Sequence, residues 1–274
     1  MCTLTLLHGP GQATEGAREG GAPTPSEVGR SISACDGEDH EVGYRVWFNR
    51  DERLTRGAEV PPAESVEAGV RYLAPTDSDA DGTWIAVNEY GVTLALLNGY
   101  ADAAAPDPVD PISRGQLVRS LSRLGSVDGL WPTSSPRALA RYRPFVLVAL
   151  DGAGASRVLR WNGRTAVVST DAAREVPFIS SSFAQDEVRV QRGAIYRDVV
   201  ADPEAPTAAE LGAYHRYVDP VSGPSAFTPS MRRDDASTRS HVEIAVTRNE
   251  VSMRYAAGAP HEAPLGPALV LPRR

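Results

Sequence analysis

A cysteine stands directly behind the initiator methionine, in the opening stretch MCTLTLLHG. If an aminopeptidase removes Met1, Cys2 becomes the first residue and carries both a thiol and a free α-amine. The reference pKa of an α-amine is about 7.7–8.0 and that of a thiol about 8.5, so part of the amine is unprotonated at neutral pH and accepts the thiol proton. Such a residue is a nucleophile with its own base. The structural alternative is a cysteine that only begins a strand.

Polar residues further along the chain have the types needed to support this nucleophile. They are Asn49, Arg50, Asp51 and Glu52 in one run, Asn88 in the segment NEYG, and Asn98 after a short apolar run. An arginine and a carboxylate near a strand end hold and polarise the thiol and amine, and an asparagine amide donates to the oxyanion of a tetrahedral intermediate. Each group also has a structural interpretation, as a solvated strand end or as turn chemistry.

Strand geometry limits which members of the run 49–52 face Cys2. Neighbouring residues of a strand point to opposite faces, so Arg50 and Asp51 do not share a face unless the strand ends or bulges there. Either Asn49 and Asp51 or Arg50 and Glu52 form the pair that faces the site.

The elements that must position these residues follow from the hydrophobic pattern. Alternation predicts strands over 3–7 and 44–48, and NEYG joins the apolar runs 84–87 and 92–97 into a hairpin whose sheet is covered on both faces. VPPAESV (60–66) is interpreted as a proline-containing loop. Helices are expected after Ser113 as N-cap, at 134–142 and at 208–218, and further strands at 144–151, 156–163, 165–170, 241–249 and 250–258. The order strands, helices, strands predicts an α+β fold of antiparallel sheets covered by helices.

Composition narrows the class of protein. The chain has 274 residues and a net charge of −7, which argues against nucleic acid as a partner. It has no run of about 20 apolar residues, so no membrane span is expected, and no signal peptide is recognisable. Two cysteines do not make a disulfide framework, and a reducing, cytoplasmic location is expected.

We interpret residues 1–274 as one domain with a flexible, Gly/Pro-rich insertion at about 9–40. Cys35 and His40 lie in or beside this insertion and lack the ligand spacing of a metal site. The five histidines are scattered outside any recognisable triad motif. No metal or cofactor is expected, and the oligomeric state is left open.

MCTL, NRDE, GTWIAVNEYGVTLALLN and the segment Asp235–Ser240 (DASTRS) together resemble the NRDE family, also called the transport and Golgi organisation 2 family. The order of Cys2, the Arg/Asp pair and the two asparagines is more distantly similar to the cholylglycine hydrolase and penicillin V acylase group. Those proteins are N-terminal nucleophile amidohydrolases. The resemblance implies a four-layer αββα sandwich with Cys2 at the end of a central strand.

The same resemblance implies roles for individual residues. Arg50 and Asp51 would flank the Cys2 thiol and amine, and Asn98 would donate to the oxyanion. Ser181 stands where the group has a second active-site asparagine, and Arg232 or Arg233 matches a later active-site arginine. The chain departs from the amidohydrolases because Arg50 and Asp51 are adjacent, whereas that group separates the two by two residues. Glu52, Asn88, Ser181 and Arg232 complete the expected set as substrate-binding residues.

Two functions are therefore predicted as alternatives. The first is a cysteine N-terminal nucleophile hydrolase that cleaves a non-peptide amide or related acyl bond of a small molecule. The second is a non-catalytic binding or trafficking protein for a hydrophobic ligand such as haem or an acyl thioester. Neither cysteine is followed by proline, so no CP-type haem motif is present.

Overall fold

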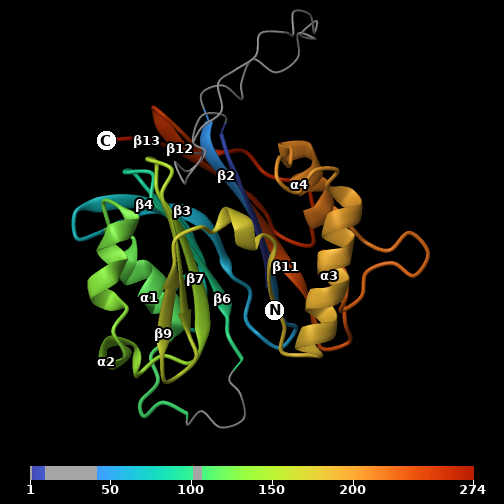
Figure 1. Cartoon of the computed structure of the whole chain (residues 1–274), viewed down its shortest axis with the longest axis horizontal. Helices are drawn as coiled ribbons and strands as arrows, with labels where there is room; N and C mark the ends of the chain where they lie inside the picture. Colours follow the sequence, from blue (N-terminus) through green and yellow to red (C-terminus); the bar gives the residue numbers. More distant parts are fainter. Residues whose placement is uncertain (1, 10–41, 101–106) are drawn as a thin grey trace, which may run out of the picture.

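Two antiparallel sheets form the centre of the molecule, seen in a computed structural model that describes residues 2–9, 42–100 and 107–274 (Figure 1). The first sheet has six strands, in the spatial order β10 (Phe178–Ser180), β1 (Cys2–His8), β2 (Val42–Arg53), β11 (Ala236–Thr247), β12 (Glu250–Ala256) and β13 (Leu269–Pro272). The second has seven in chain order, β3 (Val60–Glu67), β4 (Val70–Thr76), β5 (Ile85–Asn88), β6 (Thr93–Asn98), β7 (Phe145–Leu150), β8 (Ser156–Trp161) and β9 (Ala166–Ser169).

Helices cover the outer face of each sheet. They are α1 (Arg114–Leu121) and the short α2 (Pro136–Leu139) on the second sheet, and α3 (Gln185–Val199) and α4 (Ala208–Arg216) on the first, with short 3-10 turns at Val127–Thr133 and Ala173–Glu175. The layers are thus helix, sheet, sheet, helix. This confirms the α+β class and the four-layer αββα sandwich.

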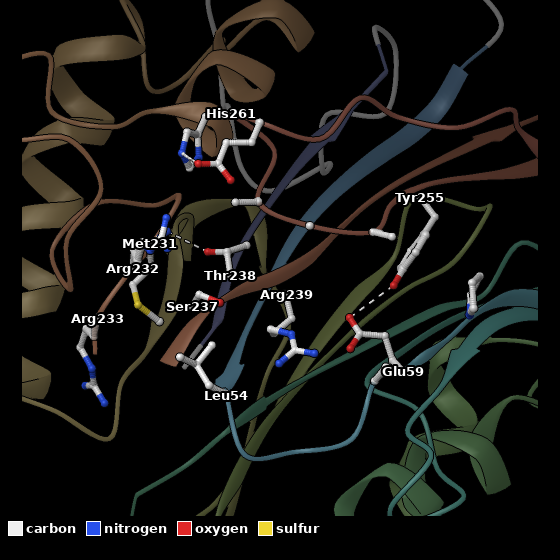
Figure 2. A pocket seen from close by; sticks show the side chains of 16 residues that line it. Leu54, Glu59, Met231, Arg232, Arg233, Ser237, Thr238, Arg239, Tyr255 and His261 are labelled. Carbon is white, nitrogen blue, oxygen red and sulfur yellow. Dashed lines mark hydrogen bonds and ion pairs between the residues drawn. The ribbon is translucent and has the colours of Figure 1, made fainter. Parts of the chain in front are cut away.

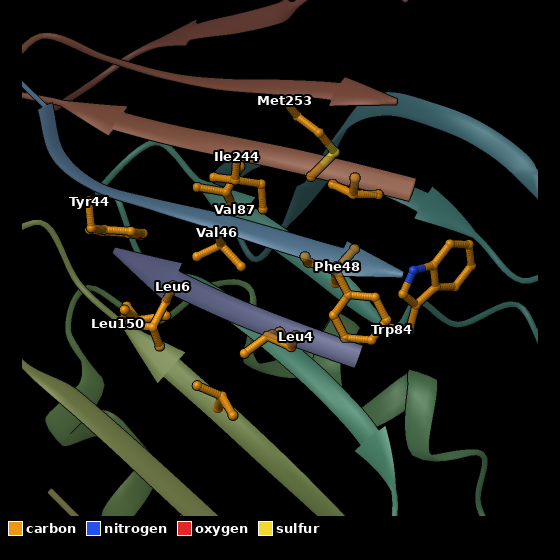
Figure 3. Close-up of a cluster of buried hydrophobic side chains, with 14 of the residues drawn as sticks. Leu4, Leu6, Tyr44, Val46, Phe48, Trp84, Val87, Leu150, Ile244 and Met253 are labelled. Atoms are coloured by element: carbon orange, nitrogen blue, oxygen red, sulfur yellow. The ribbon is translucent and has the colours of Figure 1, made fainter. Parts of the chain in front are cut away.

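The main core lies between the two sheets. Strands alternate their side chains, so Leu4 and Leu6 of β1 and Phe48 of β2 point into this layer, where they meet Val87 and Leu150 of the second sheet (Figure 3). Each of these five side chains is at most 3% exposed. This layer positions the site, because the strand that begins at Cys2 is held by apolar packing on its inner face.

Most predicted elements are confirmed, among them the hairpin of β5 and β6 and the helix after Ser113, whose side chain accepts a hydrogen bond from the Gly115 N–H. One prediction is wrong: VPPAESV is the strand β3 and not a loop. β3 is the edge strand of its sheet, and its register with β4 shifts between Val60 and Ala63. An edge strand tolerates Pro61 and Pro62 because their missing N–H groups leave no central ladder bond unmade.

The sequence pattern did not predict the helix α3 or the strands β4, β10 and β13. The helix α3, of 15 residues, follows Ala184, which has a positive φ of 41° and no capping side chain. The strand β2, expected over 44–48, continues through Arg53 and so keeps the run 49–52 inside the sheet. The insertion expected at about 9–40, with Cys35 and His40, lies outside the described residues apart from Gly9.

Candidate active site

Cys2 begins the strand β1 and lies between two partner strands. Its neighbours in register are Arg50 on β2 and Ser180 on β10. The side chain is 6% exposed and lines a cavity of about 120 Å³ at the edge of the inter-sheet core. Other walls of this cavity are formed by Trp84, Asn98 and Arg114, so the cysteine faces a polar hollow rather than closed apolar packing.

The register of three strands decides which polar residues accompany the cysteine. Cys2, Arg50 and Ser240 are directly opposite one another on β1, β2 and β11, and directly paired residues share a face. Glu52, two residues after Arg50, lies on the same face and also lines the cavity. The pair that faces the site is therefore Arg50 and Glu52.

Asn49 and Asp51 point to the other face of the sheet, under α3 and α4. The Asp51 carboxylate forms a fully buried ion pair with Arg192 of α3, with Oδ2 3.2 Å from Nη1. Its Oδ1 accepts a hydrogen bond of 2.6 Å from the Thr238 hydroxyl. The Asn49 amide donates to the His215 and Pro229 carbonyls at 2.9 and 3.0 Å. The Asn49 side chain is thus used in holding helix α4 to the sheet.

Asp51 still reaches the cysteine, but through its backbone. The register between β2 and β11 shifts at Thr238 and Ser240, opposite Asp51 and Arg50, so the ladder is irregular beside Cys2. The Asp51 backbone N–H makes a hydrogen bond to the Cys2 sulfur, and Asp51 also lines the cavity. A hydrogen bond donated to sulfur stabilises the thiolate.

Arg50 is held in place by acidic residues and an indole ring. Its guanidinium lies 3.1 Å from Glu59, 3.4 Å from Glu52 and 3.9 Å from Asp77. Its Cζ lies 4.4 Å from the centre of the Trp84 ring. Three carboxylates and a cation–π contact fix the arginine side chain, which is only 5% exposed. The positive charge beside Cys2 therefore has a defined position.

Burial dominates the acidity of the thiol. The pKa of Cys2 is raised from 9.0 to about 11, mainly by loss of hydration. The negative charge of Asp51 acts in the same direction, and the N-terminal ammonium, the Asp51 N–H and Arg50 oppose it. At neutral pH the cysteine of this chain is consequently a thiol and not a thiolate. A nucleophilic role requires a base, or a positive charge that is closer than Arg50.

The N-terminal end of α1 forms another wall. Ser113, Arg114 and Gly115 line the cavity. The backbones of Gly82 and Gly115 are in direct contact: a Cβ on Gly82 would lie only 2.6 Å from the Gly115 carbonyl carbon. This close approach brings the helix start to the Thr83–Trp84 segment. Burial lowers the pKa of Arg114, and the nearby Tyr100 and Cys2 oppose that shift.

A wider basin lies beside the cavity. It has a volume of about 610 Å³ and shares five lining residues with the cavity: Asp51, Glu52, Arg56, Asn98 and Arg114. Tyr100, Arg143 and Arg233 form other parts of its wall. The small cavity at Cys2 is therefore continuous with a space large enough for a small molecule.

Comparison with known proteins places the chain in a family. Residues 35–195, more than half of the 274, match the family described as Transport and Golgi organisation 2. The chain belongs to this family. The matched range includes Arg50 and Asn98 but not Cys2. No curated protein sequence matches the chain.

This member of the Transport and Golgi organisation 2 family is similar in structure to several solved proteins. The mutant C2A conjugated bile acid hydrolase from Clostridium perfringens aligns over 99% of this chain and 92% of its own, with 11% identity and a TM-score of 0.50. Penicillin V acylase from Agrobacterium tumefaciens aligns over 99% and 86%, with 13% identity and a TM-score of 0.49. The first likeness shows that the αββα sandwich is common to both chains.

The structure does not bring every predicted residue of this family member to Cys2. Asn88 lies on β5, where its amide donates to the Ser122 and Leu124 carbonyls at the end of α1. Ser181 follows β10 and forms a local turn with Phe183. Arg232 lines a different pocket. Of the predicted set, Arg50, Asp51, Glu52 and Asn98 line the Cys2 cavity.

Sequence reasoning missed several residues of the site, among them Trp84, Tyr100 and Arg114. Trp84 was interpreted only as part of an apolar run, yet its indole lies on Arg50 and its buried Nε1 has no hydrogen-bond partner among the described residues. Arg114 follows the N-cap Ser113, and this position on α1 was the available signal. Tyr100 follows Asn98 by two residues, and both residues line the wider basin.

The described residues contain no group of three or more His, Cys, Asp or Glu side chains placed to hold a metal ion. None of the described helices is long and apolar enough to span a membrane.

Proposed function

We propose that this protein is an N-terminal cysteine hydrolase that cleaves a non-peptide amide, or a related acyl bond, of a small molecule. The observation that carries the proposal is the position of Cys2, at the start of a central strand and in the wall of a cavity with Arg50 and Asn98. The fold supports it, since the aligned conjugated bile acid hydrolase was solved as a C2A mutant and so has its own cysteine at position 2.

The reaction begins when Met1 is removed and the α-amine of Cys2 becomes free. The amine accepts the thiol proton, and the sulfur attacks the carbonyl carbon of the substrate. The C–N bond breaks, the leaving amine takes the proton, and a thioester to Cys2 remains. Water then attacks the thioester while the α-amine accepts a proton from it, the C–S bond breaks to release the acid, and the ammonium returns the proton to the Cys2 thiolate. Atoms and charges balance without a cofactor.

Other residues stabilise the charges that form on the sulfur and on the substrate oxygen in this scheme. Arg50 and the Asp51 N–H stabilise the thiolate, because both lower the pKa of Cys2. Asn98 lies at the end of β6 in the cavity wall and donates its amide to the oxyanion. Glu52 and the other acids around Arg50 position its guanidinium and do not contact the reacting carbonyl.

The shape of the site favours a small substrate with a polar or charged part. The cavity of about 120 Å³ at Cys2 admits the scissile group, and the basin of about 610 Å³ holds the remainder. The alternative function, binding of haem or another hydrophobic ligand, has less support, because six of the fourteen residues that line the cavity are charged. A reducing compartment such as the cytoplasm fits the proposal, since Cys2 must remain a free thiol.

Intact-mass measurement and cysteine labelling test the mechanism together. The mature chain should lack Met1, and iodoacetamide at neutral pH should label Cys2 faster than Cys35 once Met1 is gone. Retention of Met1 through an N-terminal tag should slow Cys2 labelling, because the buried thiol, whose pKa is raised, then has no α-amine of its own to accept its proton.

Turnover of a panel of acylated amines gives the second test. Cys2→Ala should abolish hydrolysis, and Cys35→Ala, which changes the other cysteine of the chain, should leave it intact. Full turnover by Cys2→Ala, or a mature chain that keeps Met1 and is active, would contradict the proposal.

A further inference from the structure

A second pocket lies where β2 ends and β11 begins, apart from the Cys2 cavity. It has a volume of about 460 Å³ and is lined by residues from three segments, 54–61, 231–239 and 255–262, the last of which begins at the end of β12 (Figure 2). It shares no lining residue with the Cys2 cavity, and only Arg233 with the wider basin. The pocket is therefore a separate space and not an extension of the proposed active site.

Positive side chains outnumber negative ones in this pocket. Its charged or titratable lining residues are Arg232, Arg233, Arg239 and His261 against Glu59 and Glu262. The contrast with the whole chain is marked, because the protein carries a net charge of −7. A concave cationic site on an acidic protein concentrates anions locally.

Both acidic residues of the pocket already have partners. Glu59 binds Arg50 at 3.1 Å with one oxygen and accepts a hydrogen bond of 3.3 Å from the Tyr255 hydroxyl with the other (Figure 2). Glu262 lies 3.3 Å from Nε2 of His261. Neither carboxylate contacts the arginines of the pocket within 4.0 Å.

Two of the three arginines have a free guanidinium. Arg233 is paired with Asp235 at 2.7 Å. Arg232 and Arg239 form no ion pair and no side-chain hydrogen bond with any described residue. Figure 2 shows the Arg239 guanidinium in the interior of the pocket, between Leu54 and Glu59. Arg239 is only partly exposed, so its position is set by the surrounding wall.

Part of the remaining lining is apolar. Leu54, Pro61, Met231, Ala257 and Ala259 contribute carbon surface around the arginines. A purely inorganic ion would leave this surface unused, whereas an organic anion contacts both parts of the wall. Pockets of a few hundred cubic ångströms with a few convergent polar groups are typical of small-molecule sites.

We propose that this pocket binds a small organic oxyanion, a carboxylate or phosphate monoester, with Arg239 as the main contact and Arg232 at the rim. A planar guanidinium matches the geometry of both anions through paired N–H donors. The apolar wall receives the carbon part of the ligand. The proposal is independent of whether Cys2 is a nucleophile.

The pocket is nevertheless connected to the Cys2 cavity through two of its wall residues. Glu59 binds Arg50, and Thr238 donates its hydroxyl proton to Asp51 at 2.6 Å. Binding must therefore be measured directly and not through turnover, so that loss of either function is recognised by itself.

Isothermal titration with phenyl phosphate and with benzoate, at constant ionic strength, tests the site. Saturable binding with one site per chain is expected for at least one of them, and none for neutral benzyl alcohol. Arg239→Gln and Arg232→Gln should each weaken binding about tenfold or more, the loss of one hydrogen-bonded charge pair. Arg189→Gln, which removes an exposed arginine on α3, is the matched control and should bind like the wild type.

The Cys2→Ala variant should bind phenyl phosphate or benzoate like the wild type, even if it has lost all hydrolysis. The proposal is overturned if neither anion binds saturably. It is also overturned if Arg239→Gln and Arg232→Gln both bind the anions as tightly as the wild type does. Equal weakening in Arg189→Gln would also overturn it, because the effect would then be one of net charge. Thermal unfolding of each variant verifies its fold, and the exposed Arg232 provides the test if Arg239→Gln does not fold.

Discussion

The two faces of the strand β2 carry the same kinds of residues in different surroundings. On the inner face Arg50 lies beside Cys2 and a cavity, with three carboxylates that are 5–23% exposed. On the outer face Asp51 and Arg192 form a pair in which both side chains are 0% exposed. The inner charges can respond to a ligand, while the outer charges are sealed between sheet and helix.

This difference separates a reactive face from a supporting one. A buried pair is strongly destabilising to break, because the remaining charge has no solvent and no partner. Charges at a hydrated cavity are compensated by water and by neighbouring groups when one of them is lost. Substitutions on the outer face should therefore reduce stability, and those on the inner face should change chemistry at Cys2.

The largest effect is expected for Arg192→Met. It leaves the Asp51 carboxylate buried without its cation, and should lower the free energy of unfolding by about 3–5 kcal/mol. Arg50→Met is the inner-face counterpart and should cost about 1–2 kcal/mol, since Arg56 still neutralises Asp77. Urea unfolding measures both. Equal losses would show that the two faces do not differ in this way.

A pH effect of intermediate size is expected from Cys2 in the chain that retains Met1. Burial raises the thiol pKa from 9.0 to about 11 in the folded state, so the folded chain holds its proton more tightly than the unfolded chain. The contribution of the protonated thiol to the free energy of unfolding is fully present below pH 9. It is lost as pH rises from about 9 to 11, which lowers the free energy of unfolding by up to ~3 kcal/mol.

Urea unfolding at several alkaline pH values measures this fall. Cys2→Ser lacks the titrating thiol and is the control, so the difference between the two chains isolates the cysteine. A difference that is constant from pH 8 to pH 11 would contradict the buried environment of Cys2.

Two asparagines, one on each face, are expected to have opposite effects on stability and on turnover. Asn49→Ala removes hydrogen bonds to the His215 and Pro229 carbonyls and to His241, and should cost about 1–3 kcal/mol of stability. Asn98→Ala, at the cavity, should cost less than about 1 kcal/mol but lower kcat by about 10²–10³ if Asn98 binds the oxyanion. Unfolding curves and turnover, measured on the same samples, show which asparagine supports the fold and which acts in the reaction. Loss of turnover in a stable Asn49→Ala would refute the assignment of Asn49 to the supporting face.

The smallest effect is expected for Glu52→Gln. This side chain is 23% exposed and pairs with Arg50 at 3.4 Å and Arg56 at 3.8 Å. Both arginines keep other carboxylate partners, so stability should change by less than about 1 kcal/mol. The rate of iodoacetamide labelling of Cys2 should rise slightly, because one negative charge near the thiol is removed. A stability loss as large as that of Arg192→Met would contradict the partly exposed character of the inner-face carboxylates.

Much of the fold was predictable from local pattern. The hairpin of β5 and β6, the Ser113-capped helix and the meander of β7 to β9 follow from alternation, turn residues and capping chemistry, which act over a few residues. β3 was missed because proline suggests a loop, although an edge strand accepts it. The helix α3 was missed because it has no capping side chain. In addition, one of its buried residues, Arg192, is charged, so the buried face does not stand out as apolar in the sequence.

The candidate site was predictable only in part. Cys2, Arg50, Glu52 and Asn98 were recognised by type and order, whereas Arg114 and Trp84 reach the cavity through contacts between distant segments. Arg114 depends on two glycines, Gly82 and Gly115, whose backbones touch. Such a contact has no local sequence signal, because its two halves are 33 positions apart in a chain with 24 glycines.

The sequence by itself determined the kind of protein: alternating apolar strands, amphipathic helices and a cysteine at position 2 with an arginine, a carboxylate and asparagines in a recognisable order. It left open which face of the run 49–52 meets the cysteine. Only the tertiary structure decided this, through the pairing of Cys2 with Arg50 and of Asp51 with Arg192. The physical reason is that side-chain direction in a strand has a period of two, so the register with a neighbouring strand, and not the residue type, selects the face.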